Sequence, residues 1–297
     1  MSDRTASTWR STSSDMDPGS WAPIVVDIAT VPFEPRPPRP HKYRPDIVCD
    51  GWSNEHFTVR LASVRGYAHR YAGVCRQDAV DARSHPGTGA VVFAVADGVA
   101  SAPMADVGAH MACELAIVRL LERLDREPEG LDCIEILDEV ATAMCDRLGA
   151  PELAATYGTT LVAGAVLPAL DGPYGTVVQA GDSAAWLLRE RQFTPVVATK
   201  AARLSTVVIS SVHALPCRSD SIGPVGFDIP PDAVLLVGTD GFGDPLGDGG
   251  GLVGQLFADV LSEVPPALAL AHALDFSRET FDDDRTLVAI WPSQRQS

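Results

Sequence analysis

The feature that most constrains the fold of this chain is a set of apolar runs that each end in an aspartate. The runs are "VVFAVADGVAS" at 91–101, "VVQAGDS" at 177–183 and "VLLVGTDGFGD" at 234–244. A nearly continuous apolar run of this length is typical of a β-strand buried on both faces. Because a carboxylate is a poor core residue, the pattern predicts strands whose ends carry polar groups at a sheet edge.

These aspartates are expected to meet. Three follow apolar runs and a fourth begins one: Asp97, Asp182 and Asp240, and then Asp283 before "RTLVAIW". In neighbouring antiparallel strands, the end of one strand and the beginning of the next lie at the same edge. Carboxylates that converge there repel one another, which raises their pKa values or requires a cation. Mg²⁺ and Mn²⁺ prefer such oxygen ligands, so the sequence predicts a divalent-metal site.

Each motif also has a simpler interpretation. Asp97-Gly98 matches a hairpin turn, 181–183 a common turn, 238–244 a glycine-rich loop and 282–286 a solvated acidic turn. The shared placement at strand ends favours the metal site over four unrelated turns. A glycine beside the acid would let the backbone approach an ion and offer a carbonyl oxygen. Two ions roughly 3.5 to 4 Å apart can lower the pKa of a bridging water and orient a phosphate, so no nucleophilic side chain is needed.

The order of elements predicts an α+β fold. Helical periodicity is present in "PMADVGAHMACELAIVRLLERL", "LDCIEILDEVATAMCDRL", "GLVGQLFADVLSEV" and "PALALAHALDFSRE". Strand-like runs include "HFTVRLASVRG", "GTTLVAGAVLP", "YGTVVQAGDSAAWLLRE" and "FTPVVAT", and residues 200–230 favour a surface segment or flap because they contain three prolines. We therefore expect antiparallel sheets with helices packed outside them.

Composition separates the chain into two parts. Residues 1–50 are rich in Pro and Ser and predict a flexible segment, although "IVVDI" at 24–28 could add an edge strand, and 51–297 predict one globular domain. With a formal net charge of −16, the chain is expected to repel nucleic acid. No signal peptide or apolar span long enough for a membrane is present, which favours a cytoplasmic protein. The six scattered cysteines indicate reduced thiols.

Six motifs in order resemble the metal-dependent protein phosphatase family (PPM, the type 2C Ser/Thr phosphatases), in a divergent bacterial branch. They are "RQDAV" (76–80), "VADGVAS" (95–101), "GTTLVAG" (158–164), "AGDSAAWLL" (180–188), "GTDGFGD" (238–244) and "DDDRTLVAI" (282–290). The resemblance implies a four-layer αββα sandwich of two antiparallel β-sheets flanked by helices. It also implies two Mg²⁺ or Mn²⁺ ions and hydrolysis of phosphoserine or phosphothreonine in a protein substrate by a hydroxide held between the metals.

The resemblance also assigns roles to individual residues. Asp97 would bridge both metals, and Gly98 would offer its carbonyl. Asp240 and Asp283 would ligate one metal, and Asp78 the other, largely through water. The remaining assignments are Asp182 and Asp244 at a third, weaker metal position, Asp284 as an alternative to Asp283 if the register is off by one, and His69 as a phosphate or water contact.

Two departures from the family pattern leave alternatives open. Gly73 stands where the family has a phosphate-binding Arg, and Val99 where some members have a His that could protonate the leaving oxygen. His69, Arg70 or Arg76 could replace the missing Arg, and His69 could equally be structural. The same fold could therefore serve a pseudophosphatase or phospho-dependent binding module. A metallohydrolase of small phosphorylated molecules is a third hypothesis, and the sequence does not define the oligomeric state.

Overall fold

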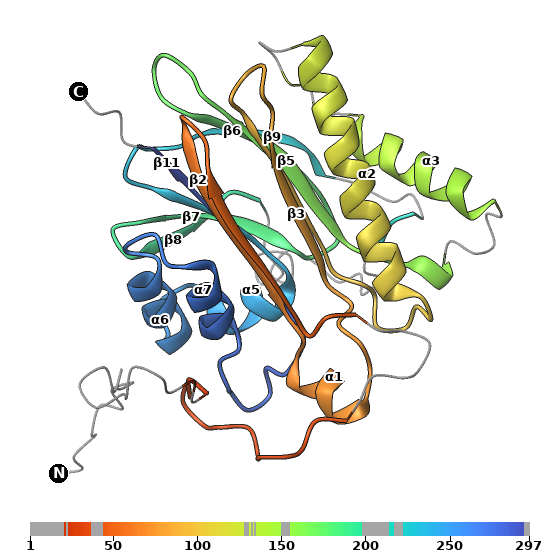
Figure 1. Cartoon of the computed structure of the whole chain (residues 1–297), viewed down its shortest axis with the longest axis vertical. Coiled ribbons are helices and arrows are strands. Elements are labelled where there is room, and N and C mark those ends of the chain that lie inside the picture. Colours follow the sequence, from red (N-terminus) through yellow and green to blue (C-terminus); the bar gives the residue numbers. More distant parts are fainter. Residues whose placement is uncertain are drawn as a thin grey trace.

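The computed structural model is a sandwich of two antiparallel β-sheets with helices on both outer faces (Figure 1). It describes residues 21, 23–36, 44–127, 131, 133, 135–149, 155–197, 214–216 and 222–293. The αββα sandwich expected from the sequence is confirmed.

The first sheet has six strands in the order β1-β2-β11-β10-β7-β8. Their bounds are β1 Ile47–Ser53, β2 Phe57–Val64, β11 Arg285–Pro292, β10 Val234–Gly238, β7 Ala184–Arg189 and β8 Gln192–Pro195. Every neighbouring pair is antiparallel. The C-terminal strand β11 is therefore central, between β2 and β10.

The second sheet has five strands in the order β3-β4-β5-β6-β9. Their bounds are β3 Ala79–Ser84, β4 Val91–Ala96, β5 Leu161–Leu167, β6 Tyr174–Ala180 and β9 Ile222–Asp228. Neighbours are again antiparallel, and a bulge interrupts the register of β6 with β9.

A different pair of helices covers the outer face of each sheet. The long helices α2 (Ala105–Arg126) and α3 (Ile136–Leu148) lie over the second sheet, and α6 (Leu252–Val260) and α7 (Ala267–Leu274) flank the first (Figure 1). The short helix α1 (Tyr67–Ala72) connects β2 to β3, and α5 (Asp240–Leu246) follows β10 and precedes α6. Among the described residues, no helix has both the length and the apolar composition that a bilayer-spanning segment needs.

Strand β4 shows why its sequence is apolar throughout. Val91, Phe93 and Val95 join the core between the sheets. The alternate residues Val92, Ala94 and Ala96 join a second core beneath α2 and α3. Because successive side chains of a strand point to opposite faces, a strand in the middle of four layers needs apolar residues at every position.

Some local expectations differ from the structure. Residues 240–246 form α5, which differs from the glycine-rich loop considered as the alternative for 238–244. Part of the expected 200–230 surface segment is the edge strand β9. A proline is tolerated there because an edge strand has a neighbour on one side only. Residues 198–213 and 217–221 lie outside the described residues. Strand β1 begins at Ile47, before the predicted boundary at residue 50. Within 24–28 the structure has one isolated bridge, from Val25 to Ser277, and no strand.

Candidate metal centre

The acids predicted to meet are carried by the same end of the sandwich. Asp78 immediately precedes β3 and Asp97 follows β4, and the first register pair of these strands joins Ala79 to Ala96. In the other sheet, Asp240 begins α5 shortly after β10 and Asp283 lies just before β11. Each sheet thus supplies one acid that ends a strand and one that precedes its antiparallel neighbour.

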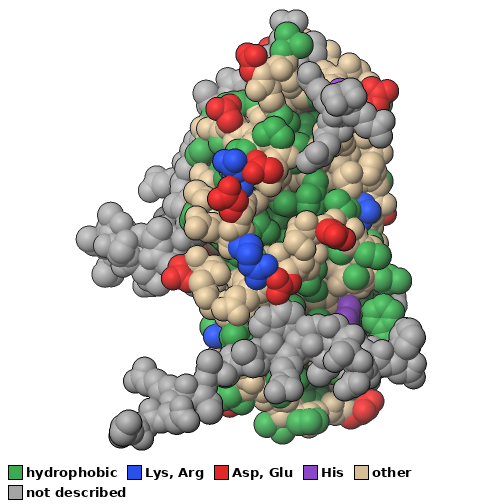
Figure 2. All heavy atoms as spheres, turned by 90° about the vertical axis from the view of Figure 1, so that its left-hand side faces the viewer, with side chains coloured by type: hydrophobic (Ala, Val, Ile, Leu, Met, Phe, Trp, Pro, Cys, Tyr) green, Lys and Arg blue, Asp and Glu red, His purple; other side chains and the backbone are tan. Residues whose placement is uncertain are grey.

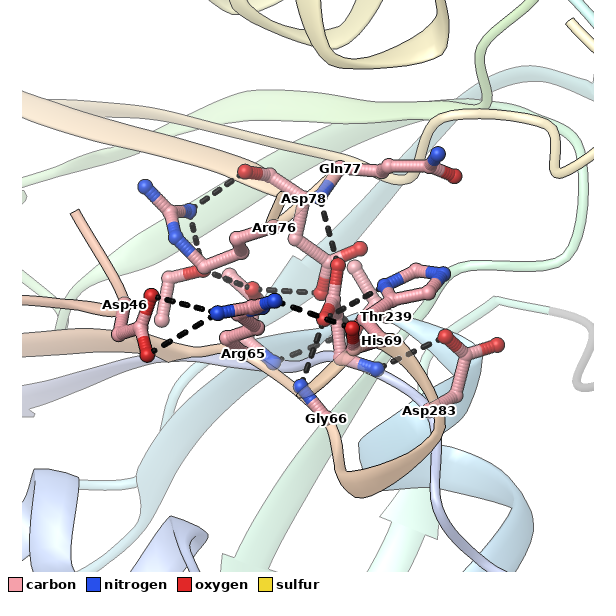
Figure 3. Close-up of polar contacts among 12 residues, drawn as sticks. Asp46, Arg65, Gly66, His69, Arg76, Gln77, Asp78, Thr239 and Asp283 are labelled. Carbon is pink, nitrogen blue, oxygen red and sulfur yellow. Dashed lines mark hydrogen bonds and ion pairs between the residues drawn. The ribbon is translucent and has the colours of Figure 1, made fainter. Parts of the chain in front are cut away.

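Asp78 is the most deeply buried of these acids. Its side chain has no exposed surface, and its Oδ2 accepts hydrogen bonds from the hydroxyls of Thr239 at 2.9 Å and Thr286 at 2.7 Å (Figure 3). Its other oxygen, Oδ1, is buried and accepts no hydrogen bond from an N–H or hydroxyl of the described residues, and the carboxyl of Asp97 lies beside Asp78. A buried carboxylate oxygen without such a donor is costly, so Oδ1 is suited to a cation.

The acids perturb one another electrostatically. Burial and the charge of Asp284 raise the pKa of Asp78 from its usual 3.8 to about 8, although the two threonine hydroxyls act against this shift. Burial, and then the neighbouring charges beginning with that of Asp78, raise the pKa of Asp97 well above its usual value. Partial desolvation by the surrounding protein atoms and the charge of Asp284 also raise the pKa of Asp283, although this side chain is exposed. Without a cation, the cluster therefore favours protonated carboxyl groups.

Asp284 and Asp283 have different surroundings, and this difference bears on which of the two acids could be the metal ligand. Oδ1 of Asp284 accepts the backbone N–H of Gly66 at 2.6 Å, and Oδ2 accepts that of Gln77 at 2.6 Å. Asp284 is buried, whereas Asp283 is exposed and its Oδ1 accepts the backbone N–H of Asp284. Both oxygens of Asp284 are thus used to hold the backbone, which leaves Asp283 better suited to bind an ion.

His69 lies beside this pair. Its Nδ1 is 2.9 Å from Oδ1 of Asp284, and its ring lies between the carboxylates of Asp78 and Asp283 in Figure 3. Burial lowers the pKa of His69, but the hydrogen bond and charge of Asp284 outweigh burial and raise the pKa overall. His69, Asp283 and Asp284 offer ligand atoms that all lie within 4.8 Å of one another.

The other predicted site residues surround this centre less directly. Asp182 lies in the turn from β6 to β7, next to Ser183, whose hydroxyl is 2.8 Å from that of Thr160. Thr160 in turn contacts the backbone of Asp97 through two hydrogen bonds. Asp244 is exposed on α5, one turn after Asp240.

The glycines of the motifs have a packing role that the sequence did not reveal. A Cβ on Gly98 would come within 2.8 Å of Ala105 at the start of α2. A Cβ on Gly241 would clash with the carbonyl oxygen of Asp284. These glycines let the acid-bearing segments pack closely against neighbouring backbone, whether or not their own carbonyls bind an ion.

Sequence reasoning missed the residues that support the acids. Thr286 and Thr239 donate to Asp78, and the hydroxyl of Ser63 is 2.6 Å from that of Thr286. The buried guanidinium of Arg76 donates to Ser63 Oγ at 2.6 Å, to the carbonyl of Asp78 and to that of Pro45. The signal available in the sequence was a threonine next to Asp240 and another three residues after Asp283, which read simply as strand formers.

A groove lies at the end of the first sheet opposite the acids. This groove of about 650 Å³ is lined by Thr58, Trp291 and Pro292 among others, whereas the acids lie at the Arg285 end of β11. Ion pairs of Arg189 with Asp232 and Arg191 with Asp259 flank it. On the side of the molecule in Figure 2, several basic side chains of the described residues lie close to acidic ones. The groove contains none of the predicted site residues.

Comparisons with known proteins agree with this architecture. The solved catalytic domain of the serine/threonine phosphatase PstP in complex with two manganese ions is 20% identical, with a TM-score of 0.58, covering 80% of this chain and 99% of that one. The PstP/Ppp phosphatase of Mycobacterium tuberculosis is 19% identical, with a TM-score of 0.57, covering 80% and 100%. RsbX in complex with magnesium is 12% identical, with a TM-score of 0.52, covering 83% and 100%. At these identities the likeness shows the fold.

The sequence itself gives the family. No curated protein matches it, but the family model described as "Protein phosphatase 2C" matches residues 65–273, which is more than half of the chain and includes every predicted site residue except Asp283 and Asp284. The family expected from the six motifs is therefore confirmed: the chain belongs to the protein phosphatase 2C family of phosphatases.

Proposed function

We propose that this phosphatase hydrolyses phosphoserine and phosphothreonine in proteins and depends on two divalent cations, Mg²⁺ or Mn²⁺. The single observation that carries the proposal is the buried Oδ1 of Asp78, which accepts no hydrogen bond from an N–H or hydroxyl of the described residues and lies within a group of carboxyls from both sheets. These groups fit a hard cation because a cation would remove their mutual repulsion and give Oδ1 a partner.

The proposed ligands follow from the surroundings of each acid. Asp97 would serve both ions, because the charges of Asp78, Asp240 and Asp283 all act on it. Asp240 and Asp283 would hold one ion, and Asp78 the other, with the carbonyl of Gly98 as a further ligand. Asp182 and Asp244 would belong to a third, weaker position.

When bound, the ions would supply an activated water for attack on phosphorus and positive charge for the phosphate. The chain's own residues would position this chemistry. Thr239 and Thr286 hold Oδ2 of Asp78, so that Oδ1 is the oxygen directed away from protein donors. His69, whose Nδ1 lies beside Asp284, would direct its other ring nitrogen to the phosphate or to a water.

One observation favours a second candidate, a pseudophosphatase that binds phosphorylated partners without turnover. Gly73, at the family's Arg position, ends α1 in the left-handed conformation with φ 67°. A larger residue is strained there, so this backbone is adapted to the absence of the arginine. The small-molecule phosphatase hypothesis has no comparable observation in its favour.

A matched pair of neighbouring acids tests the proposal. Asp283→Asn should lower Mn²⁺-dependent hydrolysis of a phosphopeptide at least about 100-fold, since it removes a ligand, while Asp282→Asn should change it less than about threefold. Asp282 is also exposed, and its carbonyl, not its carboxylate, holds the chain here by accepting the N–H of Ala68. Equal activity of both variants and wild type would refute the ligand assignment.

Mn²⁺ and phosphopeptide binding without hydrolysis by the wild type would establish the pseudophosphatase. A preference for nucleotides over phosphopeptides would establish the small-molecule alternative.

A further inference from the structure

We propose that residues 23–36 form an arm that positions α1, and with it His69, beside the candidate metal centre. In this view Phe33 and Arg65 are positioning residues that act through α1. The inference deepens the proposed function, on which its catalytic readout rests, but its structural readout does not depend on turnover.

The first part of the arm is hydrogen-bonded to the segment that follows α7. Val26 donates its N–H to the carbonyl of Ser277 at 3.0 Å, and Ser277 donates to Ile24 at 2.8 Å. Glu279 donates to the carbonyl of Ile28 at 2.8 Å. The side chain of Val26 is only 2% exposed and joins the larger hydrophobic cluster, which also includes Leu274 and Phe276. The arm is therefore packed against the segment that leads to Asp283.

The second part of the arm packs on α1. The ring of Phe33 meets those of Tyr67 and Tyr71 edge-on, with centroids 6.2 and 5.5 Å apart. The guanidinium of Arg36 lies 5.0 Å from the centroid of Tyr71, and the N–H of Arg36 donates to the carbonyl of Arg70 at 2.9 Å. Edge-on aromatic pairs and cation–π contacts each stabilise such packing.

The buried Arg65 joins the end of the arm to α1. Its Nη2 donates to the carbonyl of Arg36 at 3.3 Å and to that of His69 at 3.0 Å. Its Nη1 pairs with the carboxylate of Asp46 at 3.1 Å, ahead of β1 (Figure 3). The guanidinium of Arg65 thus joins the end of the arm, α1 and the residues before β1. Within α1 its partner is the backbone carbonyl of His69.

Helix α1 needs such support. It has six residues, none of them fully buried, and its N-cap makes no side-chain hydrogen bond. A helix this short is unstable without packing from outside. On its other side it contacts the acid segment, where Ala68 donates to the carbonyl of Asp282 at 2.9 Å and Gly66 donates to Asp284. Loss of the arm would therefore loosen His69 and the 282–284 segment together.

The test uses the full chain with Phe33→Ala, and Val31→Ala as a matched control. Val31 lies in the same arm but is 79% exposed. Amide hydrogen exchange in residues 66–72 should rise about fivefold in Phe33→Ala, because aromatic pairs contribute about 0.5–1.5 kcal/mol, and should stay unchanged in Val31→Ala. Exchange in β4 and β5 should stay unchanged in both variants, and Phe33→Tyr should restore protection.

Catalytic and binding measurements then separate positioning from general stability. Phe33→Ala should raise the KM for a phosphopeptide and the Mn²⁺ concentration for half-saturation, each about threefold or more, with Mn²⁺ binding also followed by calorimetry. Unchanged exchange in 66–72, a uniform rise that includes β4, or faster exchange in 66–72 with unchanged Mn²⁺ binding and KM would each overturn the proposal. If the wild type binds Mn²⁺ but hydrolyses nothing, the proposed function fails, while exchange and calorimetry still decide the role of the arm.

Discussion

Thr286, the second residue of β11, donates a 2.7 Å hydrogen bond to Oδ2 of Asp78, which precedes β3 in the opposite sheet. The contact joins residues 208 positions apart and fixes one carboxylate oxygen. Thr239 donates to the same oxygen from the end of β10. Hydroxyl donors from the first sheet therefore determine how an acid of the second sheet presents its free oxygen.

Thr286→Val should weaken divalent-metal binding while the fold is kept. Valine has the shape of threonine but no hydroxyl. Asp78 would therefore lose one of its two hydroxyl donors, and the hydroxyl of Ser63 would lose its contact with residue 286. Groups that orient a metal ligand typically contribute about 10–100-fold to affinity. We expect the Mn²⁺ dissociation constant, measured by calorimetry, to rise at least about tenfold.

The control is Thr58→Val, because Thr58 lies on β2 at the opposite end of the sheet and its hydroxyl makes an exposed contact with Ser53. This variant should bind Mn²⁺ like the wild type. Equal affinities for all three proteins would show that the hydroxyl of Thr286 does not orient Asp78.

The metal-free protein should lose stability as the pH rises. Folded Asp78 keeps its proton up to a pKa of about 8, whereas in the unfolded chain the proton leaves near 3.8. Between these values the folded state binds more protons, so the free energy of unfolding falls with pH, by up to about 1.4 kcal/mol per pH unit for one such group. Urea unfolding in a chelator at pH 5, 6 and 7 measures this slope.

Asp78→Asn removes one of the groups whose pKa is raised and should reduce the slope, while Asp97 and Asp283 retain their share of it. Excess Mn²⁺ should reverse it for the wild type, because a cation binds the deprotonated carboxyls. Identical slopes for wild type and Asp78→Asn in the chelator would place the pH dependence elsewhere in the molecule.

The sequence was informative where every position of a strand must be apolar because both faces of the strand are buried. An apolar run such as 91–96 predicted a strand buried on both faces, and alternate residues of β4 do enter two different cores. The acid at the end of each run was also readable, because antiparallel pairing fixes which strand ends share an edge. The fold class and the meeting of Asp97 with Asp240 and Asp283 could thus be inferred without coordinates, whereas Asp78 came only from the family resemblance and Asp182 lies less directly at the centre.

Residues whose role depends on distant partners could not be inferred in this way. Nothing local distinguishes Thr286 from any strand threonine, because its partner is 208 positions away. Residues 23–36 lack a repeating pattern, since they are held by single backbone hydrogen bonds and by Phe33 rather than by a strand or helix. Proline and glycine similarly concealed β9, whose position at the sheet edge tolerates both.

Gly66→Ala should disturb the acid segment more than its small size suggests. A Cβ at residue 66 would clash with the backbone of Asp283 and with the carbonyl of Asp282. Since the N–H of Gly66 also donates to Asp284, the backbone cannot move without losing that bond. We expect the free energy of unfolding to fall by about 2 kcal/mol or more and Mn²⁺ binding to weaken.

Gly251→Ala is the matched control for this substitution. Gly251 precedes α6 with φ −79°, and a Cβ there would meet no atom within 4 Å among the described residues. Because Gly251 is the N-cap of α6, where alanine is less favourable than glycine, the stability of this variant should fall by about 1 kcal/mol or less. An equally mild effect of Gly66→Ala would mean that the 282–284 segment is loosely held.

Arg76→Met should destabilise the protein because the guanidinium of Arg76 serves three acceptors. It is 2% exposed and donates to Ser63 Oγ and to the carbonyls of Asp78 and Pro45. Methionine fills similar volume but leaves these buried acceptors unpaired, at a cost of about 2–4 kcal/mol in the free energy of unfolding. Arg76→Lys keeps the charge but cannot reach all three acceptors, so it should recover less than half of this loss.

Arg83→Met, at a side chain that is 62% exposed and pairs with Asp81, should cost less than about 1 kcal/mol. Urea unfolding of the three variants in a chelator measures these differences without any contribution from bound metal, and an Arg76→Met protein as stable as Arg83→Met would contradict the structural role of Arg76.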